Sequence, residues 1–194
     1  LKGSFYIITA WAGKPLSADR WNSWKNVANS GHEIGSHTVS HPYLTSLSPT
    51  QVENELAVSK ATIDAQIISQ KCLTVIYPYG DFNSDVVSIT RNYYIAARGI
   101  SCGLNTEPFD FYTVRACNAE VEDIYAQTDA AEQQGVWFVA YFHSLVGAQE
   151  VDWGTYDIDM FTTYLDYLKR KNLWVGTFGA VVKYIRERSS ATIS

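Results

Sequence analysis

Short runs of β-forming residues alternate with helical patterns along the whole chain of 194 residues. This alternation is typical of a parallel sheet covered by helices. Several of the runs are apolar on both faces, as strands buried between two layers are. The sequence therefore predicts an α/β fold in which seven strands form a barrel or one large sheet. The expected strands are Ser4–Thr9, Glu33–His37, Leu73–Tyr77, Tyr93–Arg98, Phe111–Arg115, Val136–Phe142 and Leu173–Phe178.

The clearest helix signal begins at Ser48, which can cap the helix. A proline suited to the first turn follows it, and Gln51 can complete a capping box. We expect this helix to run to about Gln66, with one apolar stripe made by Val52, Leu56, Ile63 and Ile67. No internal repeat or linker interrupts the pattern, so a single domain over residues 1–194 is expected. The other expected helices are Ala18–Asn29, Ser84–Asn92, Val121–Gln134, Asp157–Lys171 and Ala180–Arg188.

Composition excludes several classes of protein. With 46% hydrophobic and 18% charged residues, the chain is neither disordered, collagen-like nor a coiled coil. Its net charge is −5 and its longest basic cluster is Lys169–Lys171, so a nucleic-acid partner is not expected. The longest apolar run, Gly135–Phe142, has the length of a strand, and no association with a membrane is expected.

Three cysteines, Cys72, Cys102 and Cys117, show no C-x-x-C spacing. Neither a zinc knuckle nor a thioredoxin-like motif is therefore indicated. Two alternatives are open. Either two of the cysteines form a disulfide and the third is a free thiol, or all three are buried core residues; the sequence alone does not show which cysteines pair.

Two of the four histidines, His37 and His41, lie four residues apart. At that spacing two imidazoles project from the same side of a helical turn, close enough to hold one metal ion. The turn must be short, because Pro42 disfavours helix at His41. An isolated H-x-x-x-H pattern indicates exposed or hydrogen-bonded histidines more often than metal ligands.

Three segments resemble successive motifs of the polysaccharide deacetylases, carbohydrate esterase family four: Gly31–Pro42, Ile76–Asp81 and Tyr141–Ser144. Their order and separation also match that family. The opening residues Leu1–Ile7 and the segment Leu173–Phe178 are similar to further strands of the family, so the resemblance covers nearly the whole chain.

This resemblance implies a distorted (β/α) barrel with its active site at the carboxyl ends of the strands. His37 and His41 would then be ligands of a divalent metal, zinc or cobalt, and His143 the general acid that protonates the leaving group. The backbone N–H of Tyr79 would stabilise an oxyanion. The implied reaction removes acetyl groups from a polysaccharide such as acetylxylan, a chitin-like chain or peptidoglycan.

The resemblance also implies residues that line the cleft or support it. Each has a plain alternative as a turn, core or packing residue. Glu33 matches a position that supports the histidine loop. The expected substrate-binding residues are Pro78, Tyr79, Leu145, Trp153 and Trp174.

The chain departs from the family in its carboxylates. The family begins with a strand that carries an Asp-Asp motif supplying the base and a metal ligand, whereas no Asp-Asp pair occurs in these 194 residues. A truncated enzyme, a non-catalytic relative and a substitute carboxylate are the three explanations, and Asp81 is the candidate substitute. Ile76 stands where many members have an arginine, and Arg115 is either its replacement or a surface charge.

Three further expectations follow from these departures. Loss of the first family strand would expose sheet edges and favour a homodimer. An extracellular or cell-surface location is expected, because the family's polymeric substrates lie outside the cell. The main rival function is a carbohydrate-binding pseudoenzyme or inactive fragment; a hydrolase that pairs His143 with Ser144 is disfavoured, because adjacent strand residues point to opposite faces.

Overall fold

The computed structural model describes residues 1–12, 18–147 and 154–190, which belong to two compact units. The larger unit contains residues 2–99, 110–114 and the C-terminal residues from 176, and the smaller unit contains residues 100–109 and 115–175 together with Leu1. No helix in the described ranges is long and apolar enough to cross a membrane. The two units are treated separately below.

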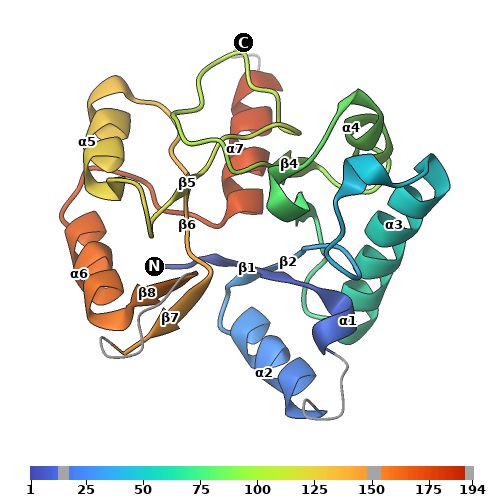
Figure 1. Cartoon of the computed structure of the whole chain (residues 1–194). Coiled ribbons are helices and arrows are strands. Elements are labelled where there is room, and N and C mark those ends of the chain that lie inside the picture. The colour runs from blue at the N-terminus through green and yellow to red at the C-terminus, as the bar shows by residue number, and fades with distance from the viewer. Residues whose placement is uncertain (13–17, 148–153, 191–194) are drawn as a thin grey trace. The chain divides into compact units, whose positions relative to one another are not determined.

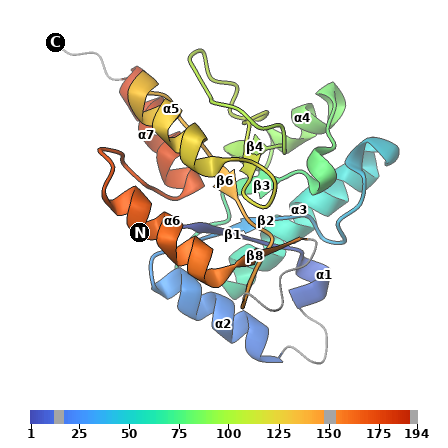
Figure 2. The same ribbon diagram turned by 60° about the vertical axis from the view of Figure 1, so that its left-hand side comes forward.

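A four-stranded parallel sheet forms the centre of the larger unit. Its strands are β1 (Ser4–Ile7), β2 (Glu33–Ser36), β3 (Thr74–Ile76) and β4 (Ala96–Arg98), which lie side by side in that order (Figures 1 and 2). Ser4 pairs with Glu33 and Thr74 with Ala96, and all three pairings are parallel. The α/β class with parallel strands is therefore confirmed.

Seven helices accompany this sheet in the described residues. Helices α2 and α3 pack against β2 (Figures 1 and 2). Their apolar sides meet the sheet in a core that contains Ile34, Leu56 and Val75, all fully buried. The helices are α1 (Thr9–Ala12), α2 (Ala18–Asn29), the 3-10 helix η2 (Leu44–Ser46), α3 (Pro49–Gln66), the 3-10 helix η3 (Pro78–Gly80), α4 (Ser84–Thr90) and α7 (Phe178–Ser190).

Helix α3 confirms the strongest helix prediction. Gln51 reaches back to the start of the helix, where its Oε1 accepts hydrogen bonds from the Ser48 N–H and hydroxyl at 2.9 Å each. These bonds satisfy a backbone N–H that a helix start otherwise leaves without a partner. The four residues of the expected apolar stripe are all buried: Val52, Leu56, Ile63 and Ile67.

The smaller unit holds two pairs of short parallel strands. Strand β5 (Cys117–Asn118) pairs with β6 (Ala140–Tyr141), and β7 (Ser144–Val146) pairs with β8 (Thr155–Asp157). Helices α5 (Ile124–Gln134) and α6 (Ile158–Lys169) follow β5 and β8, and a second core forms around Ala119, Ile124, Tyr156 and Tyr164.

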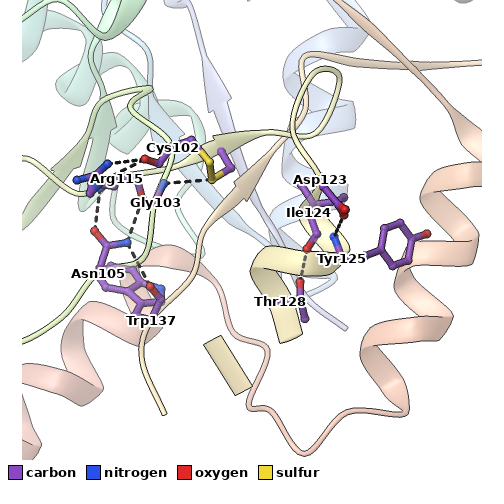
Figure 3. The surroundings of a disulfide bond; sticks show 10 residues. Cys102, Gly103, Asn105, Arg115, Asp123, Ile124, Tyr125, Thr128 and Trp137 are labelled. Atoms are coloured by element: carbon purple, nitrogen blue, oxygen red, sulfur yellow. Dashed lines mark hydrogen bonds between the residues drawn. A yellow bond between two sulfur atoms is a disulfide. The ribbon is translucent and has the colours of Figure 1, made fainter. Parts of the chain in front are cut away.

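A disulfide between Cys102 and Cys117 closes one loop of this unit, and Cys72 of the larger unit is a buried free thiol. The structure thus selects one of the two alternatives left open by the sequence. The Arg115 guanidinium donates to the Cys102 carbonyl from both Nε and Nη2 (Figure 3). Its side chain lies so close to Gly103 that an added Cβ there would meet it at 2.5 Å. Arg115 therefore fixes the disulfide loop.

Two expected strands are wrong. Residues 111–113 form a turn instead, because the Asp110 carboxylate accepts the Tyr112 N–H at 3.0 Å, and only Val114 bridges to Arg98 of β4. The segment 173–177 carries neither strand nor helix, and Phe178 begins α7. The Ser4 hydroxyl accepts the Phe178 N–H at 2.8 Å, a side-chain bond of the kind that starts a helix.

Candidate functional site

The carboxyl end of β2 leads directly into the histidine loop, residues 37–41. The His37 N–H donates to the carbonyl of Ile7 at 2.9 Å, and the His37 ring nitrogen Nδ1 lies 2.9 Å from the carbonyl oxygen of Ile76. Because a carbonyl only accepts, Nδ1 carries the proton and Nε2 is left with its lone pair. That Nε2 lies 3.0 Å from Nε2 of His41. The loop therefore brings the two predicted metal ligands together.

The histidine loop is not the helical turn that the spacing suggests. Thr38 and His41 have φ values of 67° and 64°, a conformation that is uncommon for residues other than glycine. The Thr38 hydroxyl accepts the N–H of His41 at 3.1 Å, while Thr38 itself is fully buried. The two imidazoles therefore converge from an irregular loop and not from a helical turn.

Glu55, on α3, holds the middle of this loop. One carboxylate oxygen accepts the N–H groups of Val39 and Ser40 at 2.8 and 2.9 Å, and the other accepts the Ser40 hydroxyl at 2.7 Å. A conformation with two positive-φ residues persists only where the surroundings determine it. Glu55 supplies that restraint, and no spacing signal in the sequence identifies it.

Glu33, by contrast, lies at the other end of β2 and does not support the histidine loop as expected. Its carboxylate accepts hydrogen bonds from Ser4 Oγ at 2.7 Å, Thr74 Oγ1 at 2.6 Å and the Gly179 N–H at 2.8 Å. A Cβ at Gly179 would lie 2.8 Å from the Glu33 carboxylate, so the close approach requires glycine there. Glu33 therefore ties β1 and β3 to the start of α7.

The geometry of the histidine pair fits two positions in the shell of one metal ion. Zinc binds imidazole nitrogen at ~2.0–2.1 Å, so two such ligands on one tetrahedral ion stand roughly 3.3 Å apart. The two nitrogens hydrogen-bond to each other at 3.0 Å, close to that separation, and the bond from His37 Nδ1 to Ile76 is the kind of contact that orients metal-ligating imidazoles. No group of three histidine, cysteine or acidic side chains that could hold a metal occurs within residues 1–12, 18–147 and 154–190.

The loop after β3 carries the predicted cleft residues of the larger unit. Pro78 is buried, whereas Tyr79 has a φ of 58° and is 49% exposed. The ring of Tyr79 meets His41 edge-on at a centroid distance of 4.5 Å. Both oxygens of Asp81 accept hydrogen bonds from Thr45, one from its N–H and one from its hydroxyl, each at 2.8 Å. The loop after β3 is thereby attached to η2, and the roles of these residues stay predictions.

In the smaller unit His143 follows β6 and is paired with Glu120. The Glu120 carboxylate accepts the His143 N–H at 3.0 Å, and both of its oxygens lie 2.9 Å from Nδ1 of the ring. Asn118 in turn accepts the Glu120 N–H at 3.0 Å. The Glu120 side chain is 10% exposed and that of His143 51% exposed. Nδ1 is thus committed to the carboxylate, and a proton transfer by this ring would involve Nε2.

Glu120, like Glu55, is a residue that sequence reasoning missed. The remaining predicted residues of this unit, Leu145 and Trp174, are 40% and 58% exposed, so neither is plain core. Trp153 lies outside the described residues.

Several known proteins resemble this chain in sequence or in fold. The model of the family described as "Polysaccharide deacetylase" matches residues 1–97. A gellan lyase from Bacillus sp is 31% identical over 99% of this chain and 8% of its own length. A chitooligosaccharide deacetylase from Sinorhizobium fredii is 27% identical over 48% of the chain and 41% of its own length. The chain therefore spans less than half the length of these curated relatives.

Solved structures show the same fold. A Streptococcus pyogenes deacetylase in complex with acetate has a TM-score of 0.54 and 24% identity over 60% of this chain and 52% of that one. A pseudoenzyme of the same esterase family from Bacillus anthracis has a TM-score of 0.59 and 16% identity over 94% of this chain and 56% of that one. The family model covers half of the chain and includes the complete histidine loop, and the chain therefore belongs to the polysaccharide deacetylase family.

Proposed function

We propose that this chain is a metal-dependent hydrolase that removes acetyl groups from a polysaccharide. The observation that carries the proposal is the convergence of His37 and His41, whose Nε2 atoms are 3.0 Å apart while His37 Nδ1 is held by a backbone carbonyl. Two imidazoles oriented in this way are suited to a divalent ion, zinc or cobalt. When bound, such an ion polarises an acetyl carbonyl and activates water.

The chain's own residues supply the remaining parts of this proposal. His143 donates a proton from Nε2 to the leaving amine or hydroxyl, since Glu120 fixes its ring through Nδ1. Asp81 remains the proposed substitute carboxylate, but within the described residues it forms no group of three metal-binding side chains with His37 and His41. Its oxygens retain lone pairs beyond those used by Thr45, because an ionised carboxylate offers about four acceptor sites.

The proposed substrate is a polysaccharide chain bearing acetyl groups, as in acetylxylan, chitin or peptidoglycan. Two curated relatives support this class, a gellan lyase and a chitooligosaccharide deacetylase. We further propose an extracellular or cell-surface location, which the Cys102–Cys117 disulfide supports, since such bonds persist in oxidising compartments.

A second candidate function is carbohydrate binding without catalysis. Two observations favour it: the pseudoenzyme from Bacillus anthracis matches 94% of the chain, and the described residues offer two histidines but no group of three metal-binding side chains. In this case the histidine pair would persist without the carboxylates that the reaction needs.

Acetate release distinguishes the two candidates. The 194-residue chain is incubated with acetylated xylan and with an N-acetylglucosamine tetramer, with added zinc or cobalt and with a chelator. We expect metal-dependent release that His37→Ala abolishes and that His32→Asn, which keeps an acceptor for the Gly3 N–H, leaves intact. If no condition yields acetate although an oligosaccharide binds, carbohydrate binding replaces hydrolysis as the function.

A further inference from the structure

A continuous run of aromatic rings lies beside the histidine pair. Trp11 of α1 is next to His41 at a centroid distance of 6.1 Å, His41 meets Tyr79 at 4.5 Å, and Tyr79 stacks on Tyr43 at 4.1 Å with an interplanar angle of 12°. We call Trp11, Tyr43 and Tyr79 the aromatic platform. Neither Trp11 nor Tyr43 belongs to the set of residues that the family resemblance assigns to the substrate.

The platform is exposed even though its residues are large and partly apolar. Trp11 is 51% exposed, Tyr43 is 56% exposed and Tyr79 is 49% exposed. Single exposed hydrophobic residues are ordinary, but several that contact one another beside a candidate site indicate a binding surface.

Backbone hydrogen bonds hold the segments that carry Trp11 and Tyr43. Two N–H groups of α1 donate to the histidine loop, Thr9 to Thr38 at 3.2 Å and Ala10 to Val39 at 2.9 Å. The Tyr43 carbonyl accepts the N–H and the hydroxyl of Ser46 at 3.2 and 2.7 Å.

The Tyr43–Tyr79 stack is further fixed by the bonds between Thr45 and Asp81, which attach η2 to the residue that follows η3. The platform is therefore arranged before any ligand arrives, and binding does not have to order it.

The chemistry of the platform suits the flat face of a sugar ring. A pyranose whose substituents are equatorial presents axial C–H groups on both faces, and an exposed aromatic ring covers such a face while leaving the hydroxyls at the edge in water. Trp11 and Tyr43 lie at the two ends of the run, one on each side of His41 and Tyr79.

The negative charge of the protein restricts the kind of sugar that the platform can bind. Two carboxylates bond the segments that adjoin the platform: Glu55 holds the histidine loop and Asp81 holds Thr45, and among the described residues the hydrogen-bond partners of both are uncharged N–H and O–H groups. The whole chain also carries a net charge of −5. A uronate-bearing polysaccharide would be repelled here, whereas an uncharged one would not.

We propose that Trp11 and Tyr43, the latter stacked on Tyr79, bind uncharged pyranose rings of one chain with equatorial linkages and thereby select the substrate. This inference rests on the proposed function, since it places these sugars beside the histidine pair. Its test measures equilibrium binding, which does not require turnover.

The experiment is calorimetric titration of the N-acetylglucosamine tetramer into the 194-residue chain in the presence of a chelator. Trp11→Ala and Tyr43→Ala are each expected to weaken binding about tenfold, which corresponds to about 1.4 kcal/mol. Tyr184→Ala is the matched control, because Tyr184 is a 50% exposed tyrosine on α7. Tyr43→Phe is expected to bind like the unaltered chain, because it keeps the ring. A glucuronate-containing tetramer is expected to bind at least tenfold more weakly.

The outcomes separate this inference from the proposed function. Loss of affinity in both alanine variants supports the platform even if no acetate is ever released. Unchanged affinity in both variants, with thermal melting as in the unaltered chain, overturns the platform even if deacetylation is observed. No measurable binding of the tetramer also overturns it, and equal binding of the uronate tetramer overturns the preference for uncharged sugars.

Discussion

Glu55→Ala tests whether the histidine pair depends on its loop. Glu55 lies on α3 and touches neither imidazole, yet its carboxylate accepts the N–H groups of Val39 and Ser40 and the Ser40 hydroxyl. Removing it deprives a loop with two positive-φ residues of its restraint. We expect the His37 and His41 nitrogens to lose their fixed separation as the loop relaxes.

The loss of stability in Glu55→Ala depends on how exposed the three hydrogen-bond donors to this carboxylate are. Ser40 is exposed, so water replaces the carboxylate at its N–H and hydroxyl, and the main loss is the part-buried N–H of Val39. A loss of about 1–3 kcal/mol in the free energy of unfolding is expected. Metal affinity should fall by about 10–100-fold, the usual effect of removing a residue that orients ligands.

Urea unfolding and competition for cobalt against a coloured chelator measure these two quantities. Glu55→Gln should show smaller effects on both, because its amide oxygen can still accept the two N–H groups. Glu53→Ala is the control, since Glu53 is exposed on the same helix and bonds the Tyr93 hydroxyl instead. Cobalt affinity in Glu55→Ala equal to that of the unaltered chain would refute the role of the loop.

Three other predictions concern the framework. Replacing Cys102 and Cys117 together by alanine removes a crosslink between residues 15 apart, and should lower the free energy of unfolding by about 3 kcal/mol in urea titrations. Burial raises the pKa of the Cys72 thiol to about 12, so iodoacetamide at pH 8 should leave it unmodified in the native protein and alkylate it in urea; native alkylation would contradict this. Glu33→Ala leaves the donors of Ser4, Thr74 and Gly179 without their acceptor and should cost about 3 kcal/mol or more, whereas a loss under 1 kcal/mol would show that water replaces the carboxylate.

The regular elements were predictable where the local sequence determines them. Ala18–Asn29 and the helix ending at Gln66 have the expected bounds, because caps and an apolar stripe act within a few residues. Two of the expected strands failed where a side-chain acceptor decides the outcome: nearby Asp110 for the Tyr112 N–H, and a distant residue for the Phe178 N–H. Phe178 begins a helix because Ser4, at the other end of the chain, accepts its N–H.

Some residues of the candidate site were predictable from the sequence and others were not. His37 and His41 were identified from their spacing and the family resemblance, and the structure brings their ring nitrogens together. Glu55 and Glu120 were not identified, since each is chosen by a contact with a loop far away in sequence. Positive φ values at Thr38 and His41 likewise have no sequence signal, because neither residue is a glycine.

The most direct test of the account is a cobalt titration in which acetate release from the N-acetylglucosamine tetramer and from acetylated xylan is followed in the metal-free 194-residue chain. The account predicts a rate that rises from zero, saturates at one ion per chain, and is lost in both His37→Ala and His41→Ala. Acetate release that persists in the presence of the chelator would contradict the account. So would a cobalt dependence of acetate release in His37→Ala and His41→Ala that equals that of the unaltered chain.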